Sequence, residues 1–315
     1  MHNNKEVAVV IPCYNEELLI RETVSAIPDF IDHIICVNDA STDNTANVLE
    51  EIANTNSKVK IVTNDKNLGV GGALINGYKY AIDKTNSTAI GIVAGDAQFD
   101  SSYLIPMIDL LETGGYDYVK ANRFFHREAF KKMPKYRQIG NIVVSILTKF
   151  STGYYSISDI TNGCGFLTRK VLERVNYDFV QERYDYETSM LTALSIAGAK
   201  IKDFPVPAKY GDEKSTIKLL PTVMRNLKAI WVGFWRRLYY KYILFGFHPI
   251  ALFALSGMLL TSFGIAYGAY ISFQHYIYGH TPSSATVMIS VLPIILGFQL
   301  LLTSISMDMN YEGKS

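Results

Sequence analysis

Two acidic residues in the first hundred positions follow apolar runs, which is where a sheet protein places groups that contact a ligand. Asp39 follows the run 34–37, and Asp96 follows the run 89–93. Such runs are typical of strands buried on both faces of a parallel sheet, and ligands of these sheets bind beyond the carboxyl ends of the strands. Either aspartate alone could be a turn or capping residue. Their shared position at one predicted sheet edge favours a ligand site.

A glycine-rich segment, 67–73, opens the next predicted helix at the same edge. Its glycines, Gly69, Gly71 and Gly72, lack the spacing of a dinucleotide-binding loop, and the segment lacks the lysine of a Walker loop. Contact with a phosphate and close packing of the backbone therefore both remain open for these glycines.

A basic segment, 123–149, has the composition of a site for a phosphate. It contains seven Lys or Arg residues and a single acid, Glu128. Charge runs are usually solvated faces, but here aromatic residues interleave and the apolar stretch 142–147 follows. Guanidinium groups can bind phosphate oxygens in a bidentate manner. The combination suits a lipid phosphate held at a membrane surface.

The elements that would position these residues form a β-α-β-α series. Asn15 is predicted to cap the first helix. The alternation predicts a doubly wound α/β sheet with helices on both faces. The predicted strands are 7–11, 34–37, 59–62 and 89–93, and the predicted inward-facing helix residues are Ile20, Val24, Ile27, Val48, Leu49, Ile52, Leu74, Tyr78 and Ala81.

The last quarter of the chain has the composition of a membrane segment. Of the 59 Asp, Glu, Lys and Arg residues, none lies between Tyr242 and Met307. Two apolar stretches, 242–273 and 285–307, are each long enough to cross a bilayer as a helix. The polar stretch 274–284 between them predicts a tight turn. The alternative is a buried core hairpin of a large soluble protein.

Basic residues next to the apolar stretches predict the orientation. Arg236, Arg237 and Lys241 precede the first stretch, and the turn has no Lys or Arg, so the front domain is expected on the cytoplasmic side. The segment 214–241 carries seven Lys or Arg residues and no acid, with aromatic residues interleaved, which favours a helix in the headgroup layer. No signal peptide is recognised at the N-terminus.

Overall charge and cysteine usage exclude some classes of protein. The net charge is +1, which implies no nucleic-acid partner. The three cysteines are widely spaced and show no metal-ligand pattern, so reduced core thiols are expected.

Together, these segments resemble family-2 glycosyltransferases of the GT-A fold. The basic linker and hairpin are similar to one branch, the polyprenyl-phosphate glycosyltransferases such as dolichol-phosphate mannose synthase. The matching segments are Val9–Glu16 (VVIPCYNE), Asn38–Thr45 (NDASTDNT), Asn67–Ala73 (NLGVGGA), Gly95–Gln98 (GDAQ) and Asp159–Phe166 (DITNGCGF).

The resemblance implies roles for individual residues. Asp96 would hold a divalent cation, Mg²⁺ or Mn²⁺, with Gln98 as a further ligand. Ala94 stands where the family's metal motif has its first aspartate; Mg²⁺ tolerates this because it takes few carboxylates and keeps waters and substrate phosphates. Asp39 would contact the nucleobase or ribose. The remaining predicted substrate-binding residues are Pro12, Tyr14, Glu16, Asn67, Gly69, Gln98 and Lys214.

The resemblance also points to Arg123 and Arg137 as the clamp on the acceptor phosphate. A phosphate monoester loses its second proton near pH ~6, so this nucleophile is already mostly dianionic in the cytosol. A hydroxyl acceptor usually needs a general base. Asp185 and Glu187 occupy the position of that base in related hydroxyl-transferring enzymes, and here they are expected only to orient groups.

The sequence thus predicts an inverting, metal-dependent transferase that moves one sugar from a UDP- or GDP-linked donor to polyprenyl phosphate. It would be a multi-pass protein of the plasma (inner) membrane. Its predicted parts are a cytoplasmic catalytic domain (1–213), an interfacial segment (214–241), a transmembrane hairpin (242–307) and a cytoplasmic tail (308–315). A transferase with a hydroxyl acceptor and a degenerate nucleotide-sugar-binding subunit are the alternatives. The sugar, the base and association into a homo-oligomer stay open.

Overall fold

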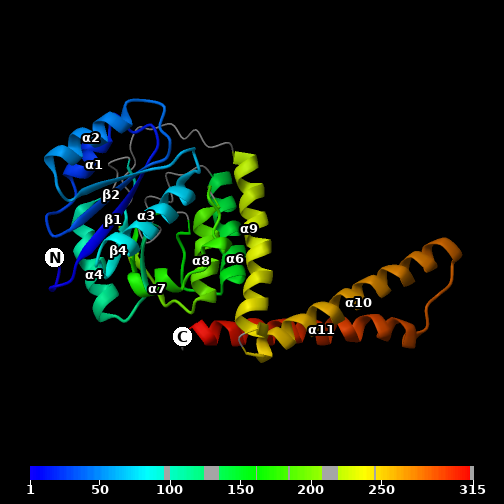
Figure 1. The fold of residues 1–315 in the computed structure, drawn as a ribbon. Helices are drawn as coiled ribbons and strands as arrows, with labels where there is room; N and C mark the ends of the chain where they lie inside the picture. Colours follow the sequence, from blue (N-terminus) through cyan, green and yellow to red (C-terminus); the bar gives the residue numbers. More distant parts are fainter. Residues whose placement is uncertain are drawn as a thin grey trace. The chain divides into compact units, whose positions relative to one another are not determined.

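The structure is a computed structural model that describes residues 1–315 except 96–99, 124–134, 161, 184, 208–218, 245 and 313–315. The side chains of 135–139, 141, 219–222 and 312 are likewise outside the description. The chain forms two compact units, Met1–Phe234 and Trp235–Ser315 (Figure 1).

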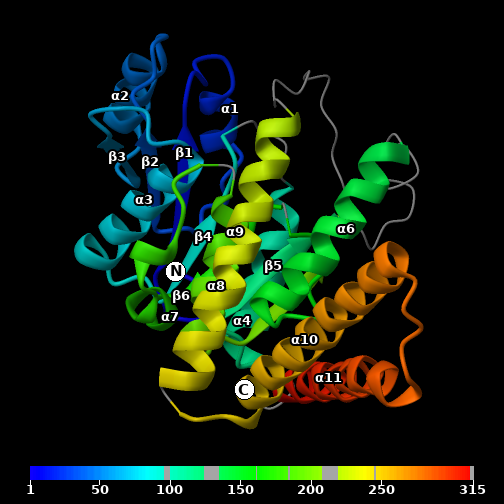
Figure 2. The same cartoon turned by 90° about the vertical axis from the view of Figure 1, so that its right-hand side faces the viewer.

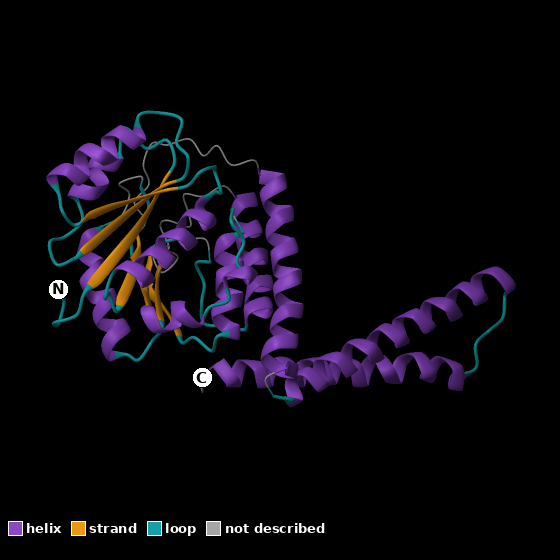
Figure 3. Cartoon of the chain, viewed as in Figure 1, coloured by secondary structure: helices purple, strands orange, loops and turns teal. Residues whose placement is uncertain are grey.

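A seven-stranded sheet is the centre of the first unit, in the order β3-β2-β1-β4-β6-β5-β7 (Figure 3). All neighbours are parallel except β6, which is antiparallel to both β4 and β5. The four predicted strands are confirmed. The strands are β1 Val7–Cys13, β2 His33–Asn38, β3 Val59–Thr63, β4 Ala89–Ile92, β5 Tyr118–Asn122, β6 Gly165–Thr168 and β7 Ile201–Pro205.

The reversed strand β6 departs from a purely parallel sheet. Gly165, the first residue of β6, pairs with Lys120 of β5. The connection 123–164 therefore ends at the carboxyl edge of the sheet, and β6 enters the sheet from that edge. Gly165 allows this close pairing because a Cβ there would lie 2.7 Å from the ring of Tyr118.

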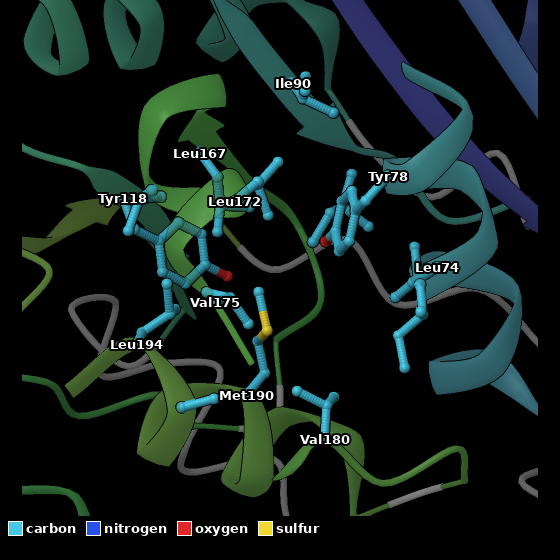
Figure 4. Packing of buried hydrophobic residues seen from close by; sticks show 14 of the residues in the cluster. Leu74, Tyr78, Ile90, Tyr118, Leu167, Leu172, Val175, Val180, Met190 and Leu194 are labelled. Atoms are coloured by element: carbon cyan, nitrogen blue, oxygen red, sulfur yellow. The ribbon is translucent and has the colours of Figure 1, made fainter. Parts of the chain in front are cut away.

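Helices cover both faces of the sheet, so its strands are buried on both sides as predicted. In β1, Ala8 and Val10 pack into the core beneath α3, whereas Val7 and Val9 pack into the opposite core with residues of α1 and α4. Figure 4 shows the first core, where Tyr78 of α3 lies among residues of several elements. The helices are α1 Ile20–Ser25, α2 Thr45–Thr55, α3 Val70–Lys84, α4 Leu104–Thr113, α6 Lys135–Thr152, α7 Arg169–Arg174, α8 Tyr186–Ile196 and α9 Leu219–Tyr239.

The predicted capping role of Asn15 is wrong. Helix α1 begins at Ile20, and Asn15 adopts a left-handed backbone with φ 57°. Its side-chain Oδ1 accepts a hydrogen bond from the backbone N–H of Thr42 at 2.8 Å. The side chain therefore ties the loop after β1 to the loop after β2, at the sheet edge predicted to bind a ligand.

Helices α6, α8 and α9 form a layer beside the sheet. Ser151 of α6 donates a hydrogen bond to the carbonyl oxygen of Ile230 in α9 at 2.8 Å, and Gly233 lies against Thr192 of α8. Figure 2 shows α6 and α9 side by side. Both helices leave large apolar side chains exposed: Ile142, Val143, Ile146, Leu147 and Phe150 on α6, and Met224, Leu227 and Trp231 on α9.

The second unit contains two long apolar helices, α10 Pro249–Tyr278 and α11 Ser284–Glu312, preceded by a π-helical turn, η4 Tyr240–Leu244. Residues 249–278 and 284–311 are long and apolar enough to cross a membrane. His248 caps α10, because its Nδ1 accepts the N–H of Ile250 at 3.3 Å. The predicted turn 274–284 is too long: α10 continues to Tyr278 and ends at Gly279, whose φ is 68°.

A buried ion pair closes the second unit at the end of α11. Arg237 donates to both carboxylate oxygens of Asp308, at 2.9 and 2.8 Å, and the hydroxyl of Tyr242 also donates to Asp308. Helix α11 therefore continues past position 307, where the sequence predicted that the hairpin ends. The charge of Asp308 ends the apolar stretch but not the helix, which continues to Glu312, and Arg237 compensates the charge of Asp308.

Candidate active site

A cavity of about 280 Å³ lies at the carboxyl edge of the sheet in the first unit. Pro12 of β1, Ala94 after β4, Arg123 after β5 and Pro207 after β7 line it. Glu187 in the first turn of α8 also contributes to the lining. The topology thus brings together residues that are up to about 195 positions apart, at the edge where ligands of such sheets bind.

Arg123 is held in this cavity by a buried aspartate. Its Nε donates to Oδ2 of Asp159 at 2.8 Å, and its Nη2 donates to Oδ1 at 3.1 Å. The side chain of Asp159 is 0% exposed and that of Arg123 is 34% exposed.

Electrostatics keep Asp159 ionised. Burial alone would raise the pKa of Asp159, but hydrogen bonds from Arg123 and the positive charge of Lys120 outweigh it, so the pKa lies below its usual value. The carboxylate is therefore a permanent partner that fixes the direction of Arg123.

For Glu187, the effect of burial on the pKa outweighs that of the nearby positive charges. Burial raises the pKa of Glu187 to about 7, although the charges of Lys120 and Arg123 favour its ionised form. At neutral pH this carboxyl group is divided between its two protonation states. Asp185 is half-buried at the N-terminal end of the same helix.

Behind the cavity wall lies a polar cluster that sequence reasoning missed. Lys120 of β5 is 1% exposed and donates to the main-chain carbonyl oxygen of Asp159. On the same strand, Asn122 donates to Asp203 of β7 at 2.5 Å. The pattern that could have revealed the cluster is a lysine inside a strand whose neighbours are apolar.

Asp39 organises the backbone around it. It is 2% exposed, and its two oxygens accept hydrogen bonds from the side chain of Asn64 at 2.7 Å and from the N–H groups of Leu68 and Gly69 at 2.9 and 2.7 Å. The carboxylate thus holds the loop between β3 and α3 at the carboxyl edge. Its predicted contact with the nucleotide stays a prediction.

Close packing accounts for the glycine-rich segment. Gly69 has φ 88°, a conformation that disfavours a side chain. A Cβ on Gly71 would lie 2.3 Å from the carbonyl oxygen of Gln181, and the N–H of Gly72 donates to the carbonyl oxygen of Glu182 at 3.0 Å. These glycines therefore allow the loop before α8 to approach the start of α3.

Several predicted site residues surround the same edge. Tyr14 is 47% exposed, and Glu16 and Asn67 are half-buried. Thr23 donates to the carbonyl oxygen of Gly95 at 2.8 Å, which fixes the chain just before Asp96. Asp96, Gln98, Lys214 and the side chain of Arg137 lie outside the described residues, so the predicted metal ligands and the second arginine of the clamp stay predictions.

The described residues near Gly95 fit a divalent cation only in part. Among the residues that the structure describes, no cluster of three or more His, Cys, Asp or Glu residues could hold a metal alone. Asp100 and Asn162, whose side chains contain oxygen atoms, line the cavity, and so does Ala94, whose side chain contains none. This chemistry fits a hard cation that takes one or two protein carboxylates and completes its shell with phosphate oxygens and water.

With this geometry established, comparison with known proteins identifies the class. Residues 8–175 match Glycosyl transferase family 2. The chain therefore belongs to this family: it is a nucleotide-sugar glycosyltransferase with a GT-A-like fold, as the sequence predicted.

Its relatives include enzymes with lipid-phosphate acceptors in their names. A UDP-N-acetylglucosamine–dolichyl-phosphate N-acetylglucosaminyltransferase of Methanococcus voltae is 28% identical over 220 residues, which cover 66% of this chain and 87% of the relative. A polyprenol monophosphomannose synthase of Mycolicibacterium smegmatis is 24% identical over 204 residues, which cover 63% and 75%.

Solved structures confirm the fold. Glucosyl-3-phosphoglycerate synthase from Mycobacterium tuberculosis in complex with UDP superposes with a TM-score of 0.55 at 17% identity, covering 73% of this chain and 80% of that one. The same enzyme has been crystallised with Mn²⁺, UDP and its product, and that structure superposes with a TM-score of 0.53 at 16% identity, covering 73% and 80%.

Proposed function

We propose that this protein transfers a single sugar from a nucleotide-diphospho-sugar to polyprenyl phosphate at the cytoplasmic face of a membrane. The observation that carries the proposal is Arg123, held by Asp159 in a cavity at the carboxyl edge of the sheet. The acceptors named for the Methanococcus and Mycolicibacterium relatives support the choice of acceptor.

The reaction joins two anionic substrates that repel each other, and positive groups at the cavity would compensate their charges. An oxygen of the acceptor phosphate attacks the anomeric carbon, and the bond from that carbon to the nucleoside diphosphate breaks, so the diphosphate leaves with the electron pair and the anomeric configuration inverts. Arg123 and Arg137 would hold the acceptor phosphate by charge-assisted hydrogen bonds. Asp96, with Gln98, would hold a divalent cation, which supplies charge neutralisation for the leaving diphosphate when bound.

No strong base is needed for this acceptor. The second proton of a phosphate monoester leaves near pH ~6, so the attacking oxygen is already mostly ionised at neutral pH. Glu187, whose pKa burial raises to about 7, would then orient groups at the cavity rather than remove a proton.

Two features support a membrane location. Residues 249–278 and 284–311 form helices long and apolar enough to span a bilayer. In the first unit, α6 and α9 expose apolar side chains, including Ile146 and Trp231, on helices that also carry basic residues. Such surfaces are typical of helices in contact with lipid headgroups.

One observation favours a second candidate, transfer to a hydroxyl acceptor. Glu187 lines the cavity, and a pKa near 7 is the value that suits a general base at neutral pH. A glycolipid or polysaccharide hydroxyl would need that base. The acceptor phosphate would not, and this difference separates the two candidates.

The test uses the purified full-length protein with a panel of UDP- and GDP-linked sugars. Undecaprenyl phosphate and dolichyl phosphate are the acceptors, the corresponding polyprenols are the controls, and products are identified by mass spectrometry. We expect a lipid-linked sugar with the phosphates and none with the alcohols. Transfer to a neutral lipid alcohol but never to the phosphate would replace this proposal with the second candidate.

A further inference from the structure

Lys120 occupies a position where an apolar residue would serve the fold better. It lies in the middle of β5, between β6 and β7, and is 1% exposed. Burial lowers the pKa of Lys120, because the charged ammonium loses its hydration. Replacing buried ionic groups by well-packed apolar residues is often neutral or stabilising, so the lysine needs an explanation other than core stability.

The surroundings of Lys120 are acidic and adjoin the cavity. The charges of Asp159, Asp203 and Glu187 all favour its ammonium form. Lys120 also lines a small second cavity of about 10 Å³ together with Gly163 and Glu187, and the last two residues line the main cavity as well. Lys120 therefore lies directly behind the cavity wall.

Two contacts link Lys120 to the residue that carries the proposed function. Its ammonium group donates to the carbonyl oxygen of Asp159, and the carboxylate of the same Asp159 receives two hydrogen bonds from the guanidinium of Arg123 and one from its backbone N–H. Lys120 thus fixes the main chain of the residue that aims the guanidinium into the cavity.

Charge balance gives Lys120 a second effect. Arg123 and Lys120 together offset Asp159 and Asp203, and without Lys120 these groups would carry one net negative charge, to which Glu187 adds when it is ionised. A negative wall would repel both a diphosphate and an acceptor phosphate, and the low dielectric of the interior strengthens that repulsion.

We infer that Lys120 is a positioning residue for the proposed transfer: it holds Asp159 so that Arg123 points into the cavity, and it reduces the negative charge of the cavity wall. The inference rests on the proposed function, since it assumes that the cavity binds two phosphate-bearing substrates. It assigns to this buried lysine a role in activity rather than in folding.

The first test is Lys120→Met, which keeps an unbranched side chain and removes the charge. We expect kcat/KM for polyprenyl phosphate to fall roughly 100-fold, the size of effect seen when one preorganised charge-stabilising group is removed. Lys202→Met is the matched control, because Lys202 is an exposed lysine on the neighbouring strand β7. It should leave the rate unchanged.

A double-mutant cycle distinguishes positioning from a structural role. If Lys120 acts through Arg123, then Lys120→Met/Arg123→Ala should lose little more activity than Arg123→Ala alone. Losses that multiply would overturn the inference that Lys120 positions Arg123 through Asp159. Lys120→Gln is the second variant, should the methionine variant not fold; it keeps an N–H donor without the charge and should lose less activity than the methionine variant.

A readout that does not need turnover is the titration of Glu187 by carbon-13 NMR. The groups that act on it by charge are Lys120 of β5, Arg123 just after β5 and Asp185 at the start of its own helix; the phenols of Tyr118 and Tyr186 lie nearby. Lys120→Met should raise the pKa of Glu187, because a cation that favours the carboxylate is lost. An unchanged pKa would contradict the proposed charge arrangement. A wild type that transfers no sugar to any phosphate acceptor would refute the proposed function instead.

Discussion

The two units each contain an arginine paired with an aspartate by two hydrogen bonds, and the pairs differ in what surrounds them. In the first unit, Asp159 is 0% exposed while Arg123 is 34% exposed and lines a cavity. In the second unit, Arg237 and Asp308 are 5% and 6% exposed. In the first pair the aspartate is buried and the arginine is partly exposed, whereas in the second pair both residues are buried.

We propose that the first pair serves the transfer reaction and that the second pair serves the stability of the second unit. Asp159 fixes an arginine that still faces the cavity, so a second anion can approach the guanidinium. Around Asp308, Arg237 and the hydroxyl of Tyr242 both donate hydrogen bonds to the carboxylate, and the ring of Tyr311 packs against that of Tyr242. A pair of this kind joins the end of α11 to the segment before α10 and has no side open to a ligand.

Arg123→Ala should have the largest effect. We expect kcat/KM for polyprenyl phosphate to fall by about 10³, because a charge-assisted contact to the acceptor phosphate is lost from a partly desolvated site. The measurement is the initial rate at varied acceptor. Arg21→Ala is the matched control, since Arg21 forms an exposed pair with Glu51 at 2.6 Å. Equal losses in both variants would contradict a specific role for Arg123.

Asp308→Ala should give the next largest effect, on stability rather than on chemistry. Removing one partner leaves the guanidinium of Arg237 buried without its charge partner, and breaking a buried pair costs about 3 kcal/mol or more. Thermal unfolding of the detergent-solubilised protein measures the loss. Placing the charges in reverse, as Arg237→Asp/Asp308→Arg, should recover part of it. A melting temperature unchanged in Asp308→Ala would show that the pair does not hold the second unit together.

Tyr242→Phe tests the same cluster with a smaller change. The variant removes the hydroxyl that donates to Asp308 and accepts from Arg237, and it keeps the ring, so a loss of about 2 kcal/mol is expected from these buried hydrogen bonds to charged groups. Tyr278→Phe serves as a control because Tyr278 is exposed near the end of α10. A loss as large as that of Asp308→Ala would mean that the tyrosine, and not the ion pair, carries the stability.

The same contrast explains what the sequence allowed us to predict. Apolar runs such as 7–11 and 89–93 identified strands because burial on both faces excludes polar residues from them. Lys120 broke that pattern from inside a strand, and its partners, Asp159 and Asp203, are 39 and 83 residues further along the chain, so no local pattern joins them.

The end of the hairpin is a second position that the local sequence did not predict. Hydropathy located two helices, but it placed the end of the hairpin at position 307 because Asp308 is charged. The partner that makes this charge compatible with a buried helix end is Arg237, 71 residues earlier in the chain. Long-range pairing of charges, rather than any local propensity, decides both of these positions.

Glu187→Gln should have the smallest effect on the rate and separates the two candidate functions. With a phosphate acceptor we expect less than a tenfold loss at neutral pH, because the nucleophile is already ionised. With a hydroxyl acceptor the variant would lose a general base, which contributes roughly 10²–10⁴-fold. Glu182→Gln, an exposed residue in the preceding loop, is the matched control.

The Glu187→Gln variant should also change how stability depends on pH. Burial raises the folded-state pKa of Glu187 to about 7, above its unfolded value, so the folded state binds this proton more tightly. Glu187 therefore lowers the stability of the wild type progressively as pH rises from the unfolded pKa to the folded one, and the glutamine variant does not share this loss. Melting temperatures measured between about pH 5 and pH 8 should rise in Glu187→Gln relative to wild type as pH increases. A constant difference would mean that Glu187 is ionised in the folded protein throughout, which would restore it as a candidate base for the hydroxyl reaction.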